Sequence, residues 1–310
     1  MVIKLFSKLG DTARAVLTDD YAFDNKLTVK STTQSGVTYS VVGVQGAGGA
    51  IGADFGVKFK LSPSVAGSIL AGSAAANTIT AKMNTAGRMS VESVLEDVAG
   101  VSGLKATLGG SATEEVHASS LLTEFIGAHV ALSALAAVSG GSGAGGSDSK
   151  ANEVSSLFRS TNVSGTLVTG AGGFAVGASA DYCVNDGALT QYSAAVSYED
   201  NGESEITLSW AGLSKALCAS YSHVISKDMS VAAEIQHRRS TGATLLTVGG
   251  KFALDDVSTV KGKIDSHGGL CLAYVQEVRP NTTLTIASRV NMNQLDVGGH
   301  RVGVCLAYEG

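Results

Sequence analysis

Short runs in which apolar and polar residues alternate fill most of the chain after its first 25 residues. Clear examples are KLTVKSTT, EITLSWAG, VAAEIQHR, VKGKID and TLTIASRV, separated by turn-forming glycine, asparagine, aspartate and serine. Successive side chains of a strand point to opposite faces, so each run predicts a strand with one apolar and one polar face. No uninterrupted apolar run has the length of a membrane-spanning helix. The sequence therefore predicts an all-β protein built as an antiparallel meander.

A sheet this long must protect its edges or close on itself. The chain has only 2 prolines, and only 16% of its residues are charged, so few devices are available to protect an open edge. Closure into a barrel removes the edges, and it is the β architecture that lipid allows. A tilted membrane-spanning strand of about 9–11 residues and its turn occupy roughly 14 residues, which leaves room for about 19 strands. A soluble sandwich shows the same alternation and stays open as an alternative.

The first residues, MVIKLFSKLGDTARAVL, have the pattern of an amphipathic helix. Leu5, Leu9 and Ala13 lie on one stripe with Val16 and Leu17. Acidic residues in and after the helix argue against a cleaved mitochondrial presequence, because presequences contain few acidic residues. We expect residues 1–25 to form a helix and a linker, and residues 26–310 to form the barrel.

Three segments invite other interpretations. SGGSGAGGSDSKANE, residues 139–153, has the composition of a flexible linker, and we expect a loop inserted between two strands. LLTEFIGAHVALSALAAV, residues 121–138, is the most helix-like apolar segment, but Glu124 and His129 interrupt it and argue against a membrane helix. GVQGAGGAIGADFG, residues 43–56, misses the dinucleotide spacing by one residue and predicts a glycine-rich hairpin. GTLVTGAGGFAVGAS, residues 165–179, also predicts a hairpin.

The sequence predicts no enzyme, no cofactor and no metal site. The 4 cysteines are far apart and lack histidines at ligand spacing, and the 6 histidines are scattered singly without a nucleophile motif beside them. The net charge of −5 argues against a basic surface for nucleic acid.

The last residues, GGHRVGVCLAYEG, end inside an alternating run. They resemble the final strand of the mitochondrial porins, the voltage-dependent anion channels. Arg301, Gly303, Leu306 and Tyr308 also resemble the C-terminal targeting signal of such outer-membrane barrels. The resemblance implies that the final strand pairs with the first, and that the outer-membrane sorting and assembly machinery recognises it.

The resemblance covers most of the chain. LGDTARAVLTDDYAFDNKLTVKS is similar to the family's helix, linker and first strand, which places the helix in the lumen with Leu5 and Leu9 against the wall. Residues 103–105, Gly-Leu-Lys, match a motif whose lysine is associated with nucleotide binding in the family. The residues expected on the nucleotide and anion path are Lys105, Arg14 and Lys8.

The resemblance implies a voltage-gated general diffusion pore of the mitochondrial outer membrane that passes ADP, ATP, phosphate, organic anions and small ions. Its expected partners are the lipid bilayer, these solutes in transit, the assembly machinery and further copies in a homo-oligomer. The chain is acidic, whereas members are commonly basic, which leaves anion or cation preference open. Two alternatives remain: a protein-import translocase pore of the same fold, whose members carry a longer N-terminal extension, and a soluble all-β binding protein.

Overall fold

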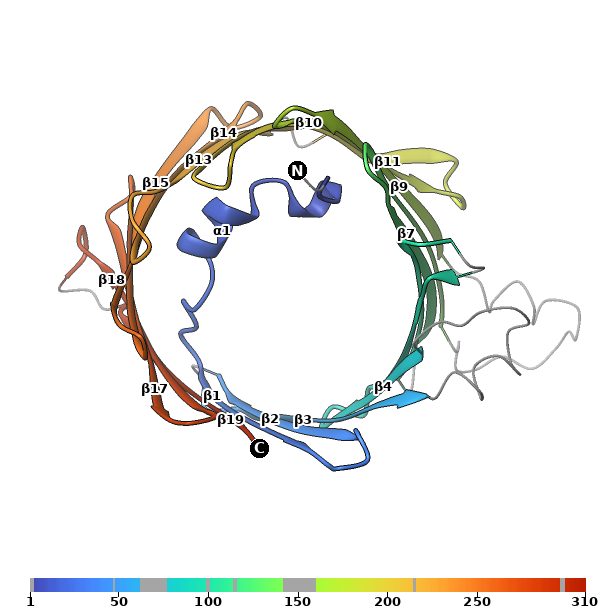
Figure 1. The fold of residues 1–310 in the computed structure, drawn as a ribbon, viewed down its shortest axis with the longest axis horizontal. Helices are drawn as coiled ribbons and strands as arrows, with labels where there is room; N and C mark the ends of the chain where they lie inside the picture. Colours follow the sequence, from blue (N-terminus) through green and yellow to red (C-terminus); the bar gives the residue numbers. More distant parts are fainter. Residues whose placement is uncertain are drawn as a thin grey trace, which may run out of the picture.

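A 19-stranded sheet closes on itself around a short helical segment (Figure 1). The computed structural model describes residues 3–46, 48–61, 77–98, 101–113, 116–141, 160–213, 216–295 and 299–310. The elements are η1 (Phe6–Lys8), α1 (Asp11–Leu17), β1 (Asn25–Thr32), β2 (Thr38–Gln45), β3 (Ile51–Leu61), β4 (Asn77–Asn84), β5 (Met89–Glu96), β6 (Leu104–Ala112), β7 (Val116–Ile126), β8 (Val130–Gly141), β9 (Ser160–Ala171), β10 (Phe174–Cys183), β11 (Ala188–Asp200), β12 (Ser204–Ala211), β13 (Ala216–Val224), β14 (Met229–Arg238), β15 (Ala243–Asp255), β16 (Ser258–Asp265), β17 (Gly269–Arg279), β18 (Thr282–Asn291) and β19 (Arg301–Glu309).

Each strand pairs antiparallel with its successor, and β1 closes the barrel by pairing parallel with β19. The parallel pair follows from the odd number of strands: alternating directions bring the first and last strands together pointing the same way. Leu27 lies opposite Leu306 in this pair, and Val29 lies opposite Tyr308. The predicted barrel and the predicted pairing of first and last strands are therefore confirmed.

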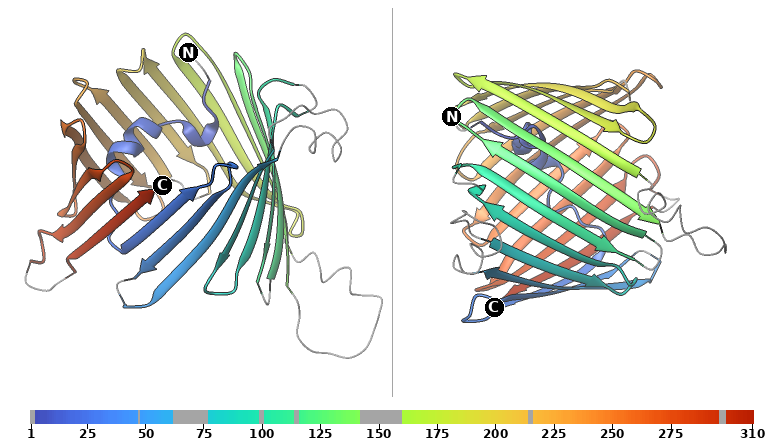
Figure 2. Two further views of the ribbon diagram at one scale, coloured as in Figure 1. Left: turned by 60° about the horizontal axis from the view of Figure 1, so that its bottom comes forward. Right: turned by 90° about the vertical axis from the view of Figure 1, so that its right-hand side faces the viewer.

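The two faces of the wall differ as the alternation predicts. On β12, Ile206, Leu208 and Trp210 point away from the lumen and are 51%, 47% and 45% exposed, whereas Glu205 and Thr207 are buried on the luminal side. The strand pairing continues this sorting around the barrel, since directly paired residues lie on the same face. The strands are inclined to the barrel axis, as closure requires, and α1 lies within the lumen (Figure 2).

The core of the molecule lies between the N-terminal segment and the wall. Ile3 and Leu9 pack on β8, β9, β10 and β11, with η1 in contact with β9 and β10. Ala13, Val16 and Leu17 pack on β14, and α1 contacts β13 through β16. The predicted apolar stripe is confirmed. Among the described residues, no helix is long and apolar enough to cross a membrane.

The predicted N-terminal amphipathic helix is confirmed as a short helix, which does not run unbroken through the stripe. Gly10 has a φ of +77°, a left-handed conformation that glycine adopts without steric cost, and it separates η1 from a seven-residue α1. Both glycine-rich segments are hairpins, as predicted: β2 and β3 pair from Gln45 and Ile51 onward, and β9 and β10 from Ala171 and Phe174 onward. The segment 121–138 lies in β7 and β8.

The expected loop at 139–153 overlaps the end of a strand. Residues 139–141 still belong to β8, where Ser139 pairs with Ser160, and residues 142–153 lie outside the described residues. The division into a helix and linker at 1–25 and a barrel at 26–310 stays a prediction.

Candidate functional site

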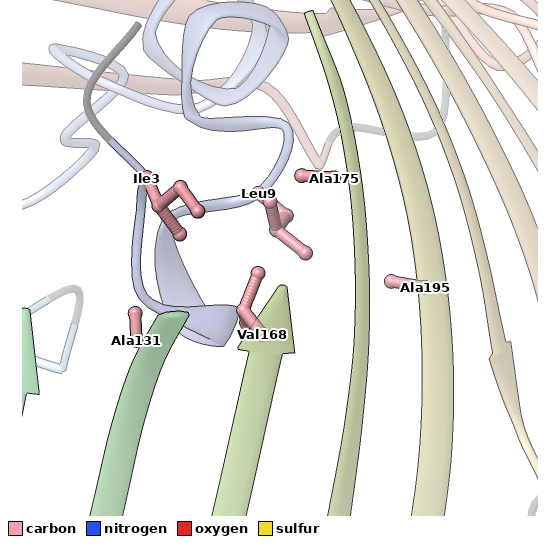
Figure 3. Packing of buried hydrophobic residues seen from close by; sticks show 6 residues of the cluster. All are labelled: Ile3, Leu9, Ala131, Val168, Ala175 and Ala195. Atoms are coloured by element: carbon pink, nitrogen blue, oxygen red, sulfur yellow. The ribbon is translucent and has the colours of Figure 1, made fainter. Parts of the chain in front are cut away.

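The candidate site is the lumen and the N-terminal segment held inside it. The segment packs on small residues of the inner wall, and we call this packing surface the seat. Ala131, Ala175 and Ala195 are buried beneath Ile3 and Leu9 (Figure 3). Because these side chains are short, the helical segment lies close to the wall and leaves the rest of the lumen free.

Leu9 and Leu5 were both expected to pack against the wall. Leu9 is 7% exposed and belongs to the buried cluster, and Leu5 is partly buried against it. Phe6 lies over Gly177 of β10, where a Cβ would stand only 2.7 Å from its ring. The absence of a side chain at this wall position makes room for the aromatic ring.

A carboxylate from the wall holds the N-terminal end of α1. Glu205 of β12 is 4% exposed, and it accepts the backbone N–H groups of Gly10 at 3.2 Å and Thr12 at 3.3 Å. The Thr12 hydroxyl also donates to it, and the Ser197 hydroxyl lies at 3.4 Å. The first N–H groups of a helix have no partner within the helix and carry partial positive charge. Glu205 therefore supplies the cap that α1 lacks in its own sequence.

Lys4 completes the charge balance around Glu205. Its Nζ lies 2.7 Å from Glu199 and 3.6 Å from Glu205. Burial by itself would lower the pKa of Lys4, but the two carboxylates outweigh it, and the pKa is raised above its ordinary value of 10.5. Lys4 is therefore charged at neutral pH and compensates these two acids.

Two lysines of β16 hold the C-terminal end of α1. Lys261 is 5% exposed, and it donates to the backbone carbonyl of Ala15 at 3.0 Å and pairs with Asp20 at 2.6 Å. Lys263 donates to the carbonyl of Leu17 at 2.5 Å. The last carbonyls of a helix carry partial negative charge, so cations suit this end as an anion suits the other.

The linker begins beneath Lys263. Its Nζ lies 4.5 Å from the centre of the Tyr21 ring, a cation–π contact. Burial raises the pKa of Tyr21 to about 12, with contributions from Cys271 and Asp20. The tyrosine is therefore a neutral phenol at physiological pH, and it supports the lysine through its ring.

The three residues expected on the anion path all have acidic neighbours. Arg14 lies 2.6 Å from Asp11 and Lys8 lies 3.1 Å from the same carboxylate; the two basic side chains are 52% and 62% exposed. Lys105 of β6 lies 3.9 Å from Glu124 of β7 on the luminal face. Arg14 and Lys8 are thus brought together on the helical segment, while Lys105 lies on a separate part of the wall. Their role in solute passage stays a prediction.

The residues of the expected targeting signal lie along β19. Arg301 pairs in register with Arg289, and Leu306 and Tyr308 point outward, 38% and 45% exposed. Gly303 lies beneath the linker, and a Cβ there would stand 2.4 Å from the carbonyl oxygen of Ala22. This close approach requires glycine for the fold itself, whatever the assembly machinery recognises.

Sequence reasoning missed Glu205, Lys261 and Lys263. They lie about 190 to 250 positions from the residues they bind, and nothing in the local pattern of β12 or β16 distinguishes them. The available signals were a single luminal charge among small side chains on β12 and two lysines spaced two positions apart on the luminal face of β16.

Known proteins resemble the chain over most of its length. The family model described as Eukaryotic porin matches residues 4–303. A mitochondrial outer membrane porin of Neurospora crassa is 35% identical over 143 residues, which cover 46% of this chain and 50% of that porin. Mitochondrial outer membrane porin 5 of Oryza sativa is 28% identical over 94% of this chain and 93% of its own length.

A porin of the outer plastidial membrane of Pisum sativum is 33% identical and matches 45% of this chain. The chain thus spans about half the length of the Neurospora crassa and Pisum sativum relatives, and nearly all of the rice porin. The family match covers the helical segment and the strands up to the first three residues of β19. On this evidence the chain belongs to the eukaryotic porin family.

Proposed function

We propose that this protein is a general diffusion pore of the mitochondrial outer membrane that passes ADP, ATP, phosphate, organic anions and small ions down their gradients. The observation that carries the proposal is the contrast between the two faces of a closed wall. Large apolar side chains are exposed around its exterior, whereas its interior carries hydroxyl and charged groups. An apolar exterior of this extent requires lipid around it, and a polar lumen holds water.

The exterior does not fit the alternative of a soluble all-β binding protein. Such a protein would have to expose a belt of residues such as Leu208 and Trp210 to water. A barrel of about 19 strands is wide enough to leave an aqueous channel, since barrels of 16–18 strands do so. The N-terminal segment lies against one part of the wall, and the free part of the lumen is the proposed passage.

Voltage-dependent closure is part of the proposal. The field acts on charged groups that can move, and the N-terminal segment carries Lys4, Lys8, Asp11 and Arg14. Movement of this segment away from the wall would break its contacts with Glu205 and Lys261. These contacts therefore favour the open pore, in which the segment lies against the wall.

The proposed location follows that of the rice and Neurospora crassa relatives, both of which are named as mitochondrial outer membrane porins. The proposed interaction with the assembly machinery involves β19, where Leu306 and Tyr308 point outward. A homo-oligomer in the membrane is a further prediction.

Solute release from liposomes tests the proposal. Refolded protein is inserted into vesicles loaded with ATP and with a dextran too large for a porin. We expect ATP to leave and the dextran to stay. Retention of ATP by vesicles that contain β-rich, protease-resistant protein would contradict the proposed function, and loss of the dextran would indicate membrane damage instead of a pore.

A further inference from the structure

We propose that the inner wall formed by β3, β4 and the start of β5 carries a docking site for the phosphate groups of polyvalent anions. Lys58, Lys60, Lys82 and Arg88 form this site, which we call the basic wall. The inference rests on the proposed function and assigns the interaction with phosphate to a part of the lumen distinct from Lys105, Arg14 and Lys8.

The strand pairing places the basic wall on the luminal face. Lys58 pairs with Thr80, which pairs with Glu92, and Lys82 pairs with Ser90. The alternate positions carry apolar residues that point outward, including Phe55 and Met83. The basic side chains line one recess of about 770 Å³ in the inner wall, together with Lys30, Asp54 and Glu92. Five basic and two acidic side chains therefore surround a single luminal space.

Within the described part of the chain, the four cations of the basic wall make no direct ion pair with the acids of the recess. Lys58, Lys60, Lys82 and Arg88 are exposed, and none makes an ion pair with any described residue. Lys30 differs, because it pairs with Glu309. The three residues expected on the anion path also have acidic partners. Lys58, Lys60, Lys82 and Arg88 therefore form a cluster of unpaired cations around one recess of the described lumen.

The opposite side of the lumen has the reverse charge. A recess beside α1 is lined by four acidic residues and two lysines: Asp19, Glu199, Glu203, Glu205, Lys251 and Lys261. The helical segment lies on that side, far from β3 and β4 (Figure 1). The net charge of −5 therefore does not describe the passage, because acidic residues gather around the helix and the basic wall faces the open water.

Phosphate chemistry fits this arrangement. A lysine ammonium acts as a compact positive charge for phosphate oxygens, and the Arg88 guanidinium can donate two parallel hydrogen bonds. Three lysines on two neighbouring strands and Arg88 in the turn after the second strand can contact several phosphates of one chain, so they favour polyphosphates over chloride. Each contact is exposed to water and screened by salt, which keeps binding weak enough for a solute in transit to leave.

Inorganic tripolyphosphate is the probe that tests the site. Single-channel current in KCl is recorded as tripolyphosphate is added to the wild type and to the Lys58→Glu/Lys82→Glu variant. We expect tripolyphosphate to reduce the wild-type current. In the variant the half-blocking concentration should rise at least about tenfold, because two attractive charges become repulsive and four units of charge change in total. The KCl reversal potential should shift toward cations.

The matched control is Lys227→Glu/Arg239→Glu, which makes the same charge change in two hairpin turns outside the basic wall. We expect its block to match the wild type. An unchanged block in Lys58→Glu/Lys82→Glu, or an equal loss in the control, would overturn the docking site while the pore stands. Lys58→Gln/Lys82→Gln replaces the first variant if charge reversal prevents folding, and retained KCl conductance shows that the barrel is intact. A wild type without conductance would overturn the proposed function itself.

Discussion

Glu205 is a buried carboxylate of β12. Its negative charge caps the N-terminal end of α1, which comes from the other end of the chain. It receives two backbone N–H groups and a hydroxyl from residues 10–12, and Lys4 lies beside it. Replacing one oxygen by an amide removes the negative charge that suits this helix end. Hydrogen bonds to charged groups contribute about 1.5–3 kcal/mol each, whereas neutral ones contribute less, so the substitution weakens the attachment of α1 to the wall.

Glu205→Gln is therefore expected to loosen α1 from the wall. In a background without native cysteines, the pair Ala13→Cys/Ala232→Cys reports attachment, because these residues lie in the same buried cluster. We expect less cross-linking in Glu205→Gln and more frequent closures in single-channel records. The control is Glu203→Gln, the same change at an exposed turn residue. Equal cross-linking in Glu205→Gln and the wild type would show that the cap does not hold the helix.

The raised pKa of Lys4 predicts how the attachment of the N-terminal segment to the wall depends on pH. Because its pKa is raised, it remains protonated below its ordinary value of 10.5, and its contribution to attachment is lost only as the pH rises through the raised pKa. The mobility of a spin label at Ser7 should be constant between pH 7 and 9 and increase above about pH 10.5. Lys4→Met should show increased mobility already at pH 7. Release of the label between pH 7 and 9 in the wild type would contradict this assignment.

Single residues could be predicted from the sequence where their position follows from the helical repeat. They could not be predicted where their contacts depend on which distant strands lie beside the helix. The helical repeat placed Leu9 on an apolar stripe, and the family resemblance implied that this residue packs against the wall, where the structure places it. Glu205 and Lys261 could not be predicted, since their partners are set by which strands of the barrel meet the helix. Gly303 was assigned to a targeting motif, while its contact with the linker required the closed barrel to be seen.

At the scale of elements, α1 depends on the wall for its stability. Seven residues are far fewer than the 12–15 that an isolated helix needs to be even marginal in water. The wall supplies an apolar seat, a carboxylate at one end and two lysines at the other. The seat is therefore as important to the helix as the sequence of the helix itself.

Ala232→Leu is expected to displace α1. Ala232 is 2% exposed beneath Ala13, Val16 and Leu17, and extra methylene groups in a packed site cost about 1–3 kcal/mol. Limited proteolysis should then cut the N-terminal segment while the barrel stays resistant. Ala233→Leu is the matched control, since it adds the same volume on the outer face of the same strand. Equal protection of the N-terminal segment in both variants would contradict the proposed seat.

The closing pair of strands can be tested through Gly303. A side chain there would collide with the backbone of Ala22 and Phe23, so Gly303→Val should push the linker away and weaken the β1–β19 pair. We expect a lower urea midpoint for protein refolded in detergent, where no assembly machinery is present. Ala307→Val, another luminal position on β19, should change the midpoint less. An unchanged midpoint in Gly303→Val would assign the glycine to targeting alone.

At the scale of the whole molecule, closure and charge placement decide what the pore can do. The period of two in the sequence predicted an apolar exterior and a polar interior, and repeated spacing predicted about 19 strands. The composition did not predict the distribution of charge inside, because the net charge of −5 sums over turns, helix and both sides of the lumen. The acidic recess beside α1 and the basic wall become visible only when the strands are placed in order.

Single-channel conductance of the refolded chain in a planar bilayer, across a KCl gradient and at voltages of both signs, tests the central claim most directly. We predict large current steps that close at high voltage of either sign. We also predict a reversal potential that shows anion preference, because the basic wall lines the part of the lumen that the helical segment leaves open. A well-folded, β-rich sample that inserts into the bilayer and conducts no current would contradict the account of this protein as a diffusion pore.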